Sequence, residues 1–600
     1  MRYKIIVFAS FIFCFLGSIN MTAQVVNSDY WSATDALGRK VREYVNTDNK
    51  RPNKYVAIFY WTWHQGNSNP NDSVKNITEI VRKYPEAMRD YNHPAWGNHR
   101  FNYYWEQPLF GYYKTTDKWV LRRHAEMLAD AGVDVVFFDC TNGDITWKDS
   151  YEALMETWDK AQKDGVKVPK IAFMLPFGYS NYSLSSLHQL YREVYKPGRY
   201  KNLWFMWKGK PGIMAYPDNL SKSKEDKEIA KFFTFRPGQP DYVNGPNRND
   251  QWGWLEMYPQ HGYAPTSTGG YEEVTVGVSQ NANPLSKGHC SAFNLKDAYG
   301  RNFTVRYGFD PRIDGYLYGW NFQEQWDRAF ELDPELVFVT GWNEYVAGQW
   351  LPKDGWTGNP FSFVDEFSWN CSRDIEPNKG WGDKGDVYYL QLIDNVRKFK
   401  GMDKQEAVSA PKTIHLNQIE DWNDVKPYYA SYKGNTVHRD AQGSCNTYYT
   451  DNTGRNDIVG TRVARDDNYI YFYVETAEKL TPSTDKNWMM LFLDTDRNKS
   501  TGWNGYDFII NRVSPQNGKV IIEKNYKGKW MWNSVAQADF VVKDNKLMIA
   551  VPRNILNLSN SALNFEFKWN DNMQDEGNIM DFYVSGDTAP GGRFNYVYKE

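Results

Sequence analysis

The order of apolar and polar residues divides the chain into two parts with different periodicities. From residue 55 to about residue 401, buried strand-like runs alternate with amphipathic helical segments. The run 133–139 (VDVVFFD) has no polar alternation, which is typical of a strand in a parallel sheet covered on both faces. It follows a segment that begins at Asp117, carries apolar residues at helical spacing and ends at Gly132. The first part therefore predicts a repeated strand–helix unit.

Eight runs of this kind are candidate strands, and helices such as 322–332 and 386–400 accompany them. The candidates are 55–61, 133–139, 170–175, 212–216, 231–236, 251–257, 274–279 and 336–342. Eight strands in alternation with helices predict a closed (β/α)₈ barrel of the TIM type. A doubly wound open sheet is the alternative, but no glycine-rich dinucleotide loop follows the first run.

Beyond residues 402–412, the pattern changes to short alternating strands and turns. Residues 461–475 predict a hairpin, and further strands are expected at 489–494, 508–512, 519–523, 546–551 and 565–569. This pattern predicts an all-β sandwich over 413–600. Because 402–412 has the composition of a linker, we expect a barrel domain at 24–401 and a sandwich domain at 413–600, each with its own core.

The N-terminus predicts an export signal over residues 1–23. Arg2 and Lys4 precede an apolar run that is too short for a comfortable membrane span. No later stretch is continuously apolar over such a length, so we expect an exported chain, periplasmic or secreted, without a membrane span. The net charge is −3 and no dense basic stripe occurs, which argues against nucleic acid as a partner.

Aromatic residues make up 17% of the chain, and 25 of them are tryptophans. Aromatic faces stack on the apolar faces of sugar rings, while indole N–H and phenol O–H groups bond to hydroxyls. Carbohydrate binding is one interpretation of this enrichment, and a large hydrophobic core is the other. The cysteines that follow the signal are widely scattered and indicate neither a zinc ribbon nor a disulfide framework.

Three carboxylates fall at predicted strand ends, where the active site of such a barrel lies. They are Asp139, Glu256 and Glu344. Glycosidic cleavage needs one carboxyl as proton donor and a second as nucleophile or base. The structural alternatives are a helix cap for Asp139, an ion pair with Arg236 for Glu256, and a bond to the following loop for Glu344. These residues are the candidate catalytic groups.

Polar and aromatic residues near the same strand ends are the candidate substrate contacts. They are Trp61, Trp63, His64, Arg236, His261, Gln280, Trp342, Asn343, Tyr345, Asp365 and Glu366. The last two belong to the long loop after the last strand, which also carries Asp374 and Glu376. A loop of this length inside a compact domain is typically functional. For the histidines, an ordinary hydrogen-bonded position is an equally good interpretation.

The runs 55–63, 117–139 and 341–348 (GWNEYVAG) resemble glycoside hydrolases of the family 71/99-like group. The resemblance spans about residues 50–400 and implies a (β/α)₈ enzyme that is endo-acting on α-linked glucans or mannans. In family 99, two catalytic glutamates lie three residues apart, and the resemblance makes Glu344 the first. The second position holds Ala347, which cannot transfer a proton. Either another carboxylate does this work, or the domain binds sugar without cleaving it.

The chain from about His415 resembles family 9 carbohydrate-binding modules, with an Asp-x-Asp feature in 491–507. Asp494, Asp496, Asn498 and Asp507 are candidate ligands for a structural calcium ion, because they offer hard oxygen donors. A plain turn network is the alternative. Catalysis itself is expected to need no cofactor. The sequence thus predicts a hydrolase that cleaves glycosidic bonds of an extracellular polysaccharide. A non-catalytic glycan-binding protein and a polysaccharide lyase are the alternatives.

Overall fold

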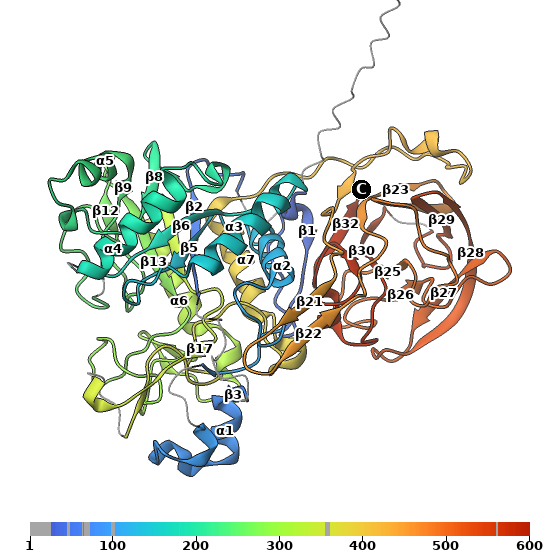
Figure 1. Cartoon of the computed structure of the whole chain (residues 1–600). Coiled ribbons are helices and arrows are strands. Elements are labelled where there is room, and N and C mark those ends of the chain that lie inside the picture. Colours follow the sequence, from blue (N-terminus) through green and yellow to red (C-terminus); the bar gives the residue numbers. More distant parts are fainter. Residues whose placement is uncertain are drawn as a thin grey trace, which may run out of the picture.

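The computed structural model describes residues 26–44, 48–62, 64, 73–97, 102–178, 180–239, 241–354, 360–559 and 562–600. The expected export signal lies outside these residues, as does Trp63. Figure 1 shows a helix-rich part with a lobe below it, beside a sheet-rich part formed by the C-terminal residues. Within the described residues, no helix is both long enough and apolar enough to cross a membrane.

A parallel sheet forms the centre of the first part. Its strands are β2 (Tyr55–Tyr60), β5 (Val135–Asp139), β6 (Lys170–Met174), β13 (Tyr271–Gly277) and β16 (Leu336–Thr340), with the antiparallel β12 (Tyr263–Pro265) at one edge. Their order is β12-β13-β16-β2-β5-β6, so the last parallel strand lies beside the first. This order suits a barrel and not a doubly wound sheet, in which the first strand is not joined to the last. The sheet makes up half of a barrel.

Shorter parallel pairings continue beyond β6. Met174 bridges to Met214, which directly follows β8 (Lys210–Ile213), and β8 pairs with β9 (Thr234–Phe235). β10 (Gly238–Gln239) then pairs with β11 (Trp252–Gly253). The strands expected at 231–236 and 251–257 are thus shorter than predicted. The first begins later because Ser223 caps a helix, α5 (Lys224–Phe232), that includes its first residues.

Helices cover the outside of this sheet. They are α2 (Lys118–Asp130), α3 (Lys148–Lys163), α4 (Asn181–Leu190), α6 (Trp320–Leu332) and α7 (Val387–Lys400). α2 begins as predicted, because the Asp117 carboxylate accepts the backbone N–H groups of Trp119 and Val120.

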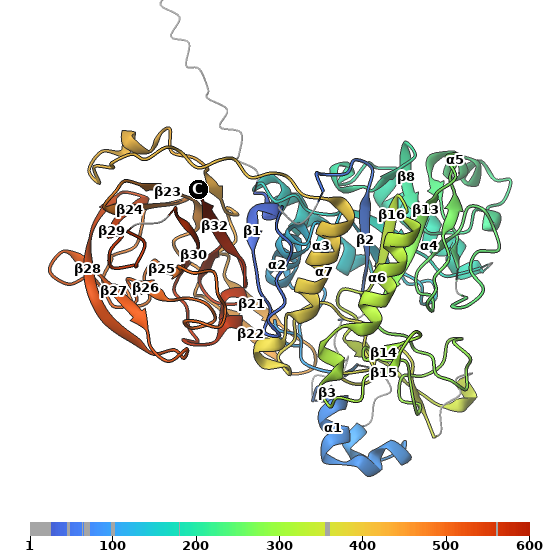
Figure 2. The same ribbon diagram turned by 180° about the vertical axis from the view of Figure 1, so that it is seen from behind.

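The lobe below the sheet is built from connections that follow the parallel strands. It contains β3 (Lys75–Asn76), α1 (Ile77–Lys83), β4 (Tyr103–Tyr104), β14 (Phe303–Thr304), β15 (Gly308–Phe309) and β17 (Val346–Ala347). Figure 2 shows this lobe below the sheet and below the start of α6. Because these segments leave the strands at their carboxyl ends, the lobe marks the face on which an active site is expected.

Most strands of the second part form one antiparallel sheet, not the two separate sheets of the predicted sandwich. They are β20 (Tyr429–Ala430), β23 (Ile458–Arg465), β24 (Tyr469–Thr476), β25 (Met490–Asp494), β26 (Phe508–Ile510), β27 (Lys519–Asn525), β28 (Trp532–Lys543), β29 (Lys546–Pro552), β30 (Asn564–Asp571), β31 (Asp587–Ala589) and β32 (Asn595–Lys599). Irregularities at Ile458/Gly460 and Ile522/Glu523 bend the sheet, and strand twist lets it curl around its own core (Figure 1). The hairpin expected at 461–475 is confirmed as β23–β24.

The N-terminal residues complete this second sheet. β1 (Trp31–Ser32) pairs antiparallel with β32, and Trp31 lies opposite Tyr596. Figure 2 shows β1 between the two parts. Further contacts join the parts, because Arg593 forms a buried ion pair with Asp386 at 2.8 Å. Residues 402–412 therefore connect two parts that are already fastened together, and do not act as a free tether.

A hairpin from the second part also reaches the lobe. Its strands are β21 (Arg439–Gln442) and β22 (Tyr448–Asp451). Arg439 forms a buried ion pair with Asp117 at 2.7 Å. The Tyr112 backbone N–H donates to the Tyr449 hydroxyl at 2.7 Å. The hairpin thus supports the long connection between β2 and α2.

Candidate active site

Glu344 follows β16 and is held by a buried guanidinium group. Its side chain is 2% exposed, and that of Arg373 is 1% exposed. Arg373 Nε donates to Oε2 at 3.0 Å, and Nη2 donates to Oε1 at 2.8 Å. Burial raises the pKa of Glu344 well above its usual range, and the charge of Arg373 opposes this rise. Because Arg373 engages both oxygens, Glu344 is fixed in place and does not face solvent.

Further carboxyl groups of the long loop after β16 surround this ion pair. Both oxygens of Glu366 accept the backbone N–H of Arg373, at 3.1 and 3.0 Å. Burial raises the pKa of Asp374 to about 8, and its carboxylate accepts the Trp105 indole N–H. The charge of Asp365 also acts on Glu344 and raises its pKa. The structure thus brings Glu344, Asp365 and Glu366 together, as the sequence predicts.

Asp139 ends β5 and shares the same electrostatic environment. Its carboxylate accepts the Thr141 backbone N–H at 3.0 Å and the Asn142 side-chain amide at 3.4 Å. Burial raises the pKa of Asp139 to about 6, against these hydrogen bonds, and the charge of Asp365 raises it too. Asp139 does not cap α3, whose N-cap residue is Trp147. Asp365 therefore interacts with a carboxyl group at each of two strand ends.

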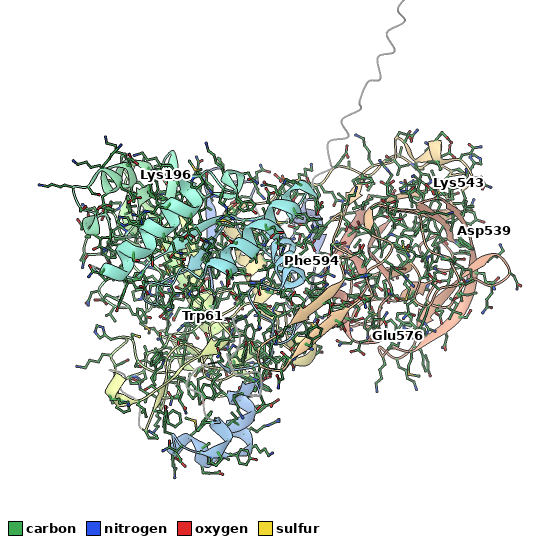
Figure 3. All side chains as sticks on the ribbon, in the orientation of Figure 1. Trp61, Lys196, Asp539, Lys543, Glu576 and Phe594 are labelled. Carbon is green, nitrogen blue, oxygen red and sulfur yellow. The ribbon has the colours of Figure 1, made fainter. Side chains whose placement is uncertain are left out.

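Asn343 and Trp61 join the ends of β16 and β2. The Trp61 backbone N–H donates to Asn343 Oδ1 at 2.8 Å. Figure 3 places Trp61 between the helix-rich part and the lobe. His64 is fully buried, and burial lowers its pKa to about 3, so its imidazole is neutral at physiological pH. Its ring lies 4.7 Å from that of Tyr113. These residues form an inner wall of the candidate site.

Two aromatic residues predicted to contact a sugar are core residues instead. Trp342 is fully buried, 5.5 Å from the His124 ring of α2 and 6.0 Å from the Tyr389 ring of α7. Its side chain therefore packs on the covering helices. Tyr345 stacks on Trp105 at 5.2 Å and is also fully buried. The prediction was wrong for both because position along a strand end does not determine which way a side chain points.

Arg236, which was predicted to contact substrate, is paired with Glu272 instead. Its guanidinium donates to the two oxygens of Glu272, at 2.7 and 2.9 Å. Glu272 is the second residue of β13 and also accepts the Trp207 indole N–H at 3.1 Å. The group therefore lies toward the amino ends of the strands, away from the expected substrate. The alternative ion pair between Arg236 and Glu256 is wrong for the same reason.

Glu256, His261 and Gln280 form a second group. Glu256 is fully buried and accepts the His261 backbone N–H at 2.8 Å and Nδ1 at 2.5 Å. Burial raises the pKa of Glu256. Gln280 donates to the backbone carbonyl of Glu256 at 3.3 Å. Glu256 is thus partnered by His261, whereas Glu344 is partnered by Arg373, and the contacts of Glu256 do not include the Arg373 cluster.

Ala347 occupies an apolar environment. It lies in β17, opposite Tyr103 of β4, and is fully buried. Its cluster includes Trp96, Phe361 and Phe363. The position at which the resembling family has its second glutamate is thus unsuited to a charge, because an unpaired buried carboxylate is costly.

Two residues that were not predicted from the sequence complete the cluster. Arg373 neutralises Glu344, and Trp254 lies one residue beyond β11. The guanidinium carbon of Arg373 is 5.7 Å from the Trp254 ring, which is half-buried and 5.7 Å from that of Phe59. Trp254 is a better candidate for sugar stacking than Trp342. Two features of the sequence could have indicated these residues. Trp254 precedes the candidate Glu256 by two residues, and Arg373 stands next to Asp374 in a loop rich in aromatic residues.

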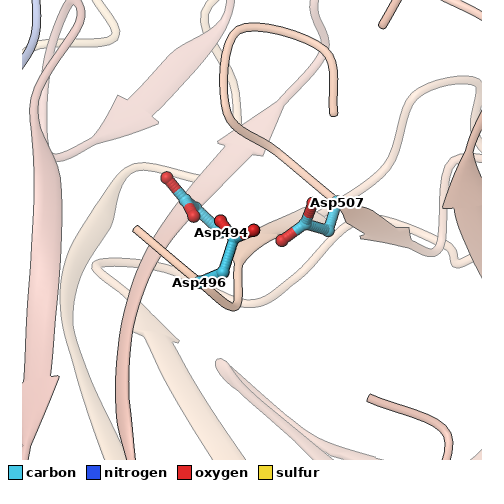
Figure 4. A group of neighbouring side chains, drawn as sticks. All are labelled: Asp494, Asp496 and Asp507. Carbon is cyan, nitrogen blue, oxygen red and sulfur yellow. The ribbon is translucent and has the colours of Figure 1, made fainter. Parts of the chain in front are cut away.

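An acidic group in the second part matches three of the four predicted calcium ligands. Asp494, Asp496 and Asp507 offer oxygens that lie within 4.8 Å of one another (Figure 4). Asp494 Oδ1 is buried and has no hydrogen-bond partner among the described residues, while Lys499 donates to Oδ2 at 2.7 Å. The Asn498 side chain instead accepts the Ser500 backbone N–H at 3.1 Å. The three aspartates, with one free buried oxygen, fit a hard cation.

Comparisons with known proteins find only distant similarity. No family model matches the chain, and no curated protein matches it. Two solved structures of a GH99 endo-alpha-mannosidase from Bacteroides thetaiotaomicron are similar. One, in complex with BIS-TRIS propane, is 13% identical, covers 57% of this chain and 97% of its own, and has a TM-score of 0.34. The other is 12% identical, covers 58% and 98%, and has a TM-score of 0.32. At these values the similarity assigns neither activity nor substrate.

Proposed function

We propose that the chain is an exported glycoside hydrolase that cleaves a polysaccharide, with its active site at the carboxyl ends of the strands of a (β/α)₈-type barrel. The observation that carries the proposal is the convergence of carboxyl groups around Arg373. Arg373 pairs with Glu344 at 2.8 Å and lies 4.0 Å from Glu366, and Asp365 interacts with both Glu344 and Asp139. Glycosidic cleavage requires a pair of carboxyl groups, one as proton donor and one as nucleophile or base.

The proposed roles follow from the protonation state of each carboxyl group and from the partners that its oxygens already have. Asp139, with a pKa of about 6, donates its proton to the glycosidic oxygen as the C–O bond breaks. Asp365 is half-buried and either activates water or attacks the anomeric carbon itself. Glu344 does not transfer a proton in this scheme, because Arg373 occupies both of its oxygens. It positions Arg373 and, through it, the loop that carries Asp365.

The experiment is a polysaccharide array with products identified by mass. We expect shortened, saturated oligosaccharides from at least one α-linked glucan or mannan. Asp139→Asn and Asp365→Asn should each abolish turnover and leave the far-UV circular dichroism unchanged. Asp144→Asn is the matched control for Asp139, because Asp144 is an exposed acid in the loop that follows Asp139. Full turnover by Asp139→Asn would contradict the proposed roles.

A non-catalytic glycan-binding protein is the second candidate, and the buried Ala347 favours it. In that case glycans would bind and no product would form with any polysaccharide. Unsaturated products would instead indicate a lyase. The array therefore separates the three functions in a single measurement.

We further propose that the aspartates at 494, 496 and 507 bind a structural calcium ion. Calcium should raise the free energy of unfolding by about 2.7 kcal/mol at a free concentration 100 times its Kd. Asp496→Asn should abolish this increase without affecting turnover. Thermal unfolding in calcium and in EGTA measures both, and an equal midpoint in the two buffers would contradict the proposal.

A further inference from the structure

Three aromatic side chains are exposed to solvent, two on the connection between β13 and α6 and one on the first residue of α6. Tyr307 is 87% exposed, and Phe309 and Trp320 are each 41% exposed. We call these three residues the aromatic platform. Scattered single apolar residues are normal on protein surfaces, but a group of exposed rings on one connection indicates a binding surface.

The aromatic platform is held by hydrogen bonds. Glu324 of α6 accepts the backbone N–H groups of Val305 and Arg306 at 2.8 and 3.0 Å, which fixes the turn that carries Tyr307. The Trp320 indole N–H donates to Asp310 at 2.7 Å. A fixed surface loses little conformational entropy when a ligand binds, which favours recognition.

The aromatic platform is connected to the candidate active site. Asn302 donates to the Asp310 carbonyl at 3.2 Å, and the neighbouring Arg301 donates to the Asp374 carbonyl at 2.8 Å. Figure 2 shows β14 and β15 in the lobe beside the start of α6. The connection that carries the exposed rings is thus hydrogen-bonded to the loop of the candidate active site.

We propose that the aromatic platform binds uncharged sugar rings of a polysaccharide outside the active site, an inference that rests on the proposed glycan substrate. Aromatic faces stack on the apolar faces of sugars. The neighbouring cations are already partnered, because Arg312 pairs with Asp310 at 2.5 Å and Arg306 contacts Glu331 at 3.4 Å. The surface therefore offers rings without a free positive charge, which suits a neutral glycan better than an acidic one.

The test is native gel electrophoresis of the full chain in gels that contain α-mannan, dextran or soluble starch. The Asp139→Asn background prevents cleavage of the polymer. We expect retardation by at least one polymer, and we expect Tyr307→Ala/Trp320→Ala to weaken that binding by about tenfold. Ile313→Ala is the control, because Ile313 is 98% exposed on the same connection but not aromatic.

Turnover of short oligosaccharides by the double variant with Asp139 restored should be unchanged. Equal retardation of the double variant and its parent would overturn the inference, as would no retardation by any polymer. A dimer in sedimentation that the double variant abolishes would assign the surface to a second copy of the chain and also overturn it. If no glycan is hydrolysed but the double variant still loses the retardation that its parent shows, the proposed hydrolysis is wrong and the glycan-binding inference remains supported.

Discussion

Arg373 and Glu344 form a buried ion pair in the candidate site, which makes their energetic role testable. Arg373→Met leaves the Glu344 carboxylate buried without its partner, so the free energy of unfolding should fall by about 3–5 kcal/mol. Adding Glu344→Gln should restore part of the loss. Urea denaturation measures both. The control is Arg192→Met in the exposed pair with Glu225, where the unfolding midpoint should change little. An unaltered unfolding midpoint in Arg373→Met would show that the pair is not structural.

The raised pKa of Asp139 predicts the alkaline limb of the pH–rate profile. The proton donor must be protonated, so kcat/KM should fall as the pH rises through about 6. The same raised pKa makes the free energy of unfolding fall as the pH rises toward about 6, because the carboxyl group ionises at a lower pH in the unfolded chain than in the folded one. His261→Gln is the control, because His261 contacts Glu256, a different candidate acid. This variant should leave the limb in place; loss of the limb would contradict its assignment to Asp139.

At the residue level, the sequence predicted which residues lie near strand ends better than where their side chains point. Asp365 and Glu366 join Glu344 as expected, because they belong to the loop that leaves the same strand. Trp342 and Arg236 do not join them, because one packs on helices and the other turns toward Glu272. A period of two residues fixes the face of a strand only when its register is known.

Among the elements, long apolar runs were predicted well and short ones poorly. β5 and β6 match their predicted ranges closely, since a run of buried residues between helices is a strong signal. β9 and β11 are only two residues long, too short for a periodicity to define them. The β21–β22 hairpin was not predicted, because its partners lie more than 300 positions away in sequence.

The contact between this hairpin and the lobe provides an element-level prediction. Gly111 has φ +82°, and a Cβ added there would lie 2.4 Å from the Tyr449 ring. Gly111→Ala should therefore displace the hairpin, lower the thermal midpoint and reduce turnover. Gly209→Ala is the matched control, because Gly209 has φ +84° and open space around its Cβ position. Both variants carry the same backbone strain, so equal midpoints would show that the hairpin contact contributes nothing.

For the whole molecule, composition located the change from the parallel to the antiparallel part but did not reveal how the parts are joined. Residues 402–412 have the composition of a linker, and they do connect the two parts. The pairing of β1 with β32 could not be read from the sequence, because a two-residue strand has no periodicity. The independence expected of the two parts therefore has to be tested.

A chain that ends at Gly401 tests this independence. It lacks β32, so β1 loses its partner strand and Trp31 loses the rings of Phe594 and Tyr596, at 5.4 and 6.1 Å. Figure 3 places Phe594 at the junction of the two parts. The truncation also removes the partner of the buried Asp386 and exposes apolar surface. We therefore expect the truncated chain to aggregate or to unfold at a lower temperature.

Co-production of residues 26–401 with residues 402–600 as separate chains is the control, because it restores every contact except the peptide bond. The two chains should purify as a 1:1 complex with the circular dichroism of the intact protein. A monomeric truncated chain with the thermal midpoint of the full-length protein would contradict the prediction. In that case the interface would contribute no stability, and the second part would serve substrate binding alone. Loss of folding in the truncated chain and its recovery in the complex would instead make the second sheet part of the structural support of the active site.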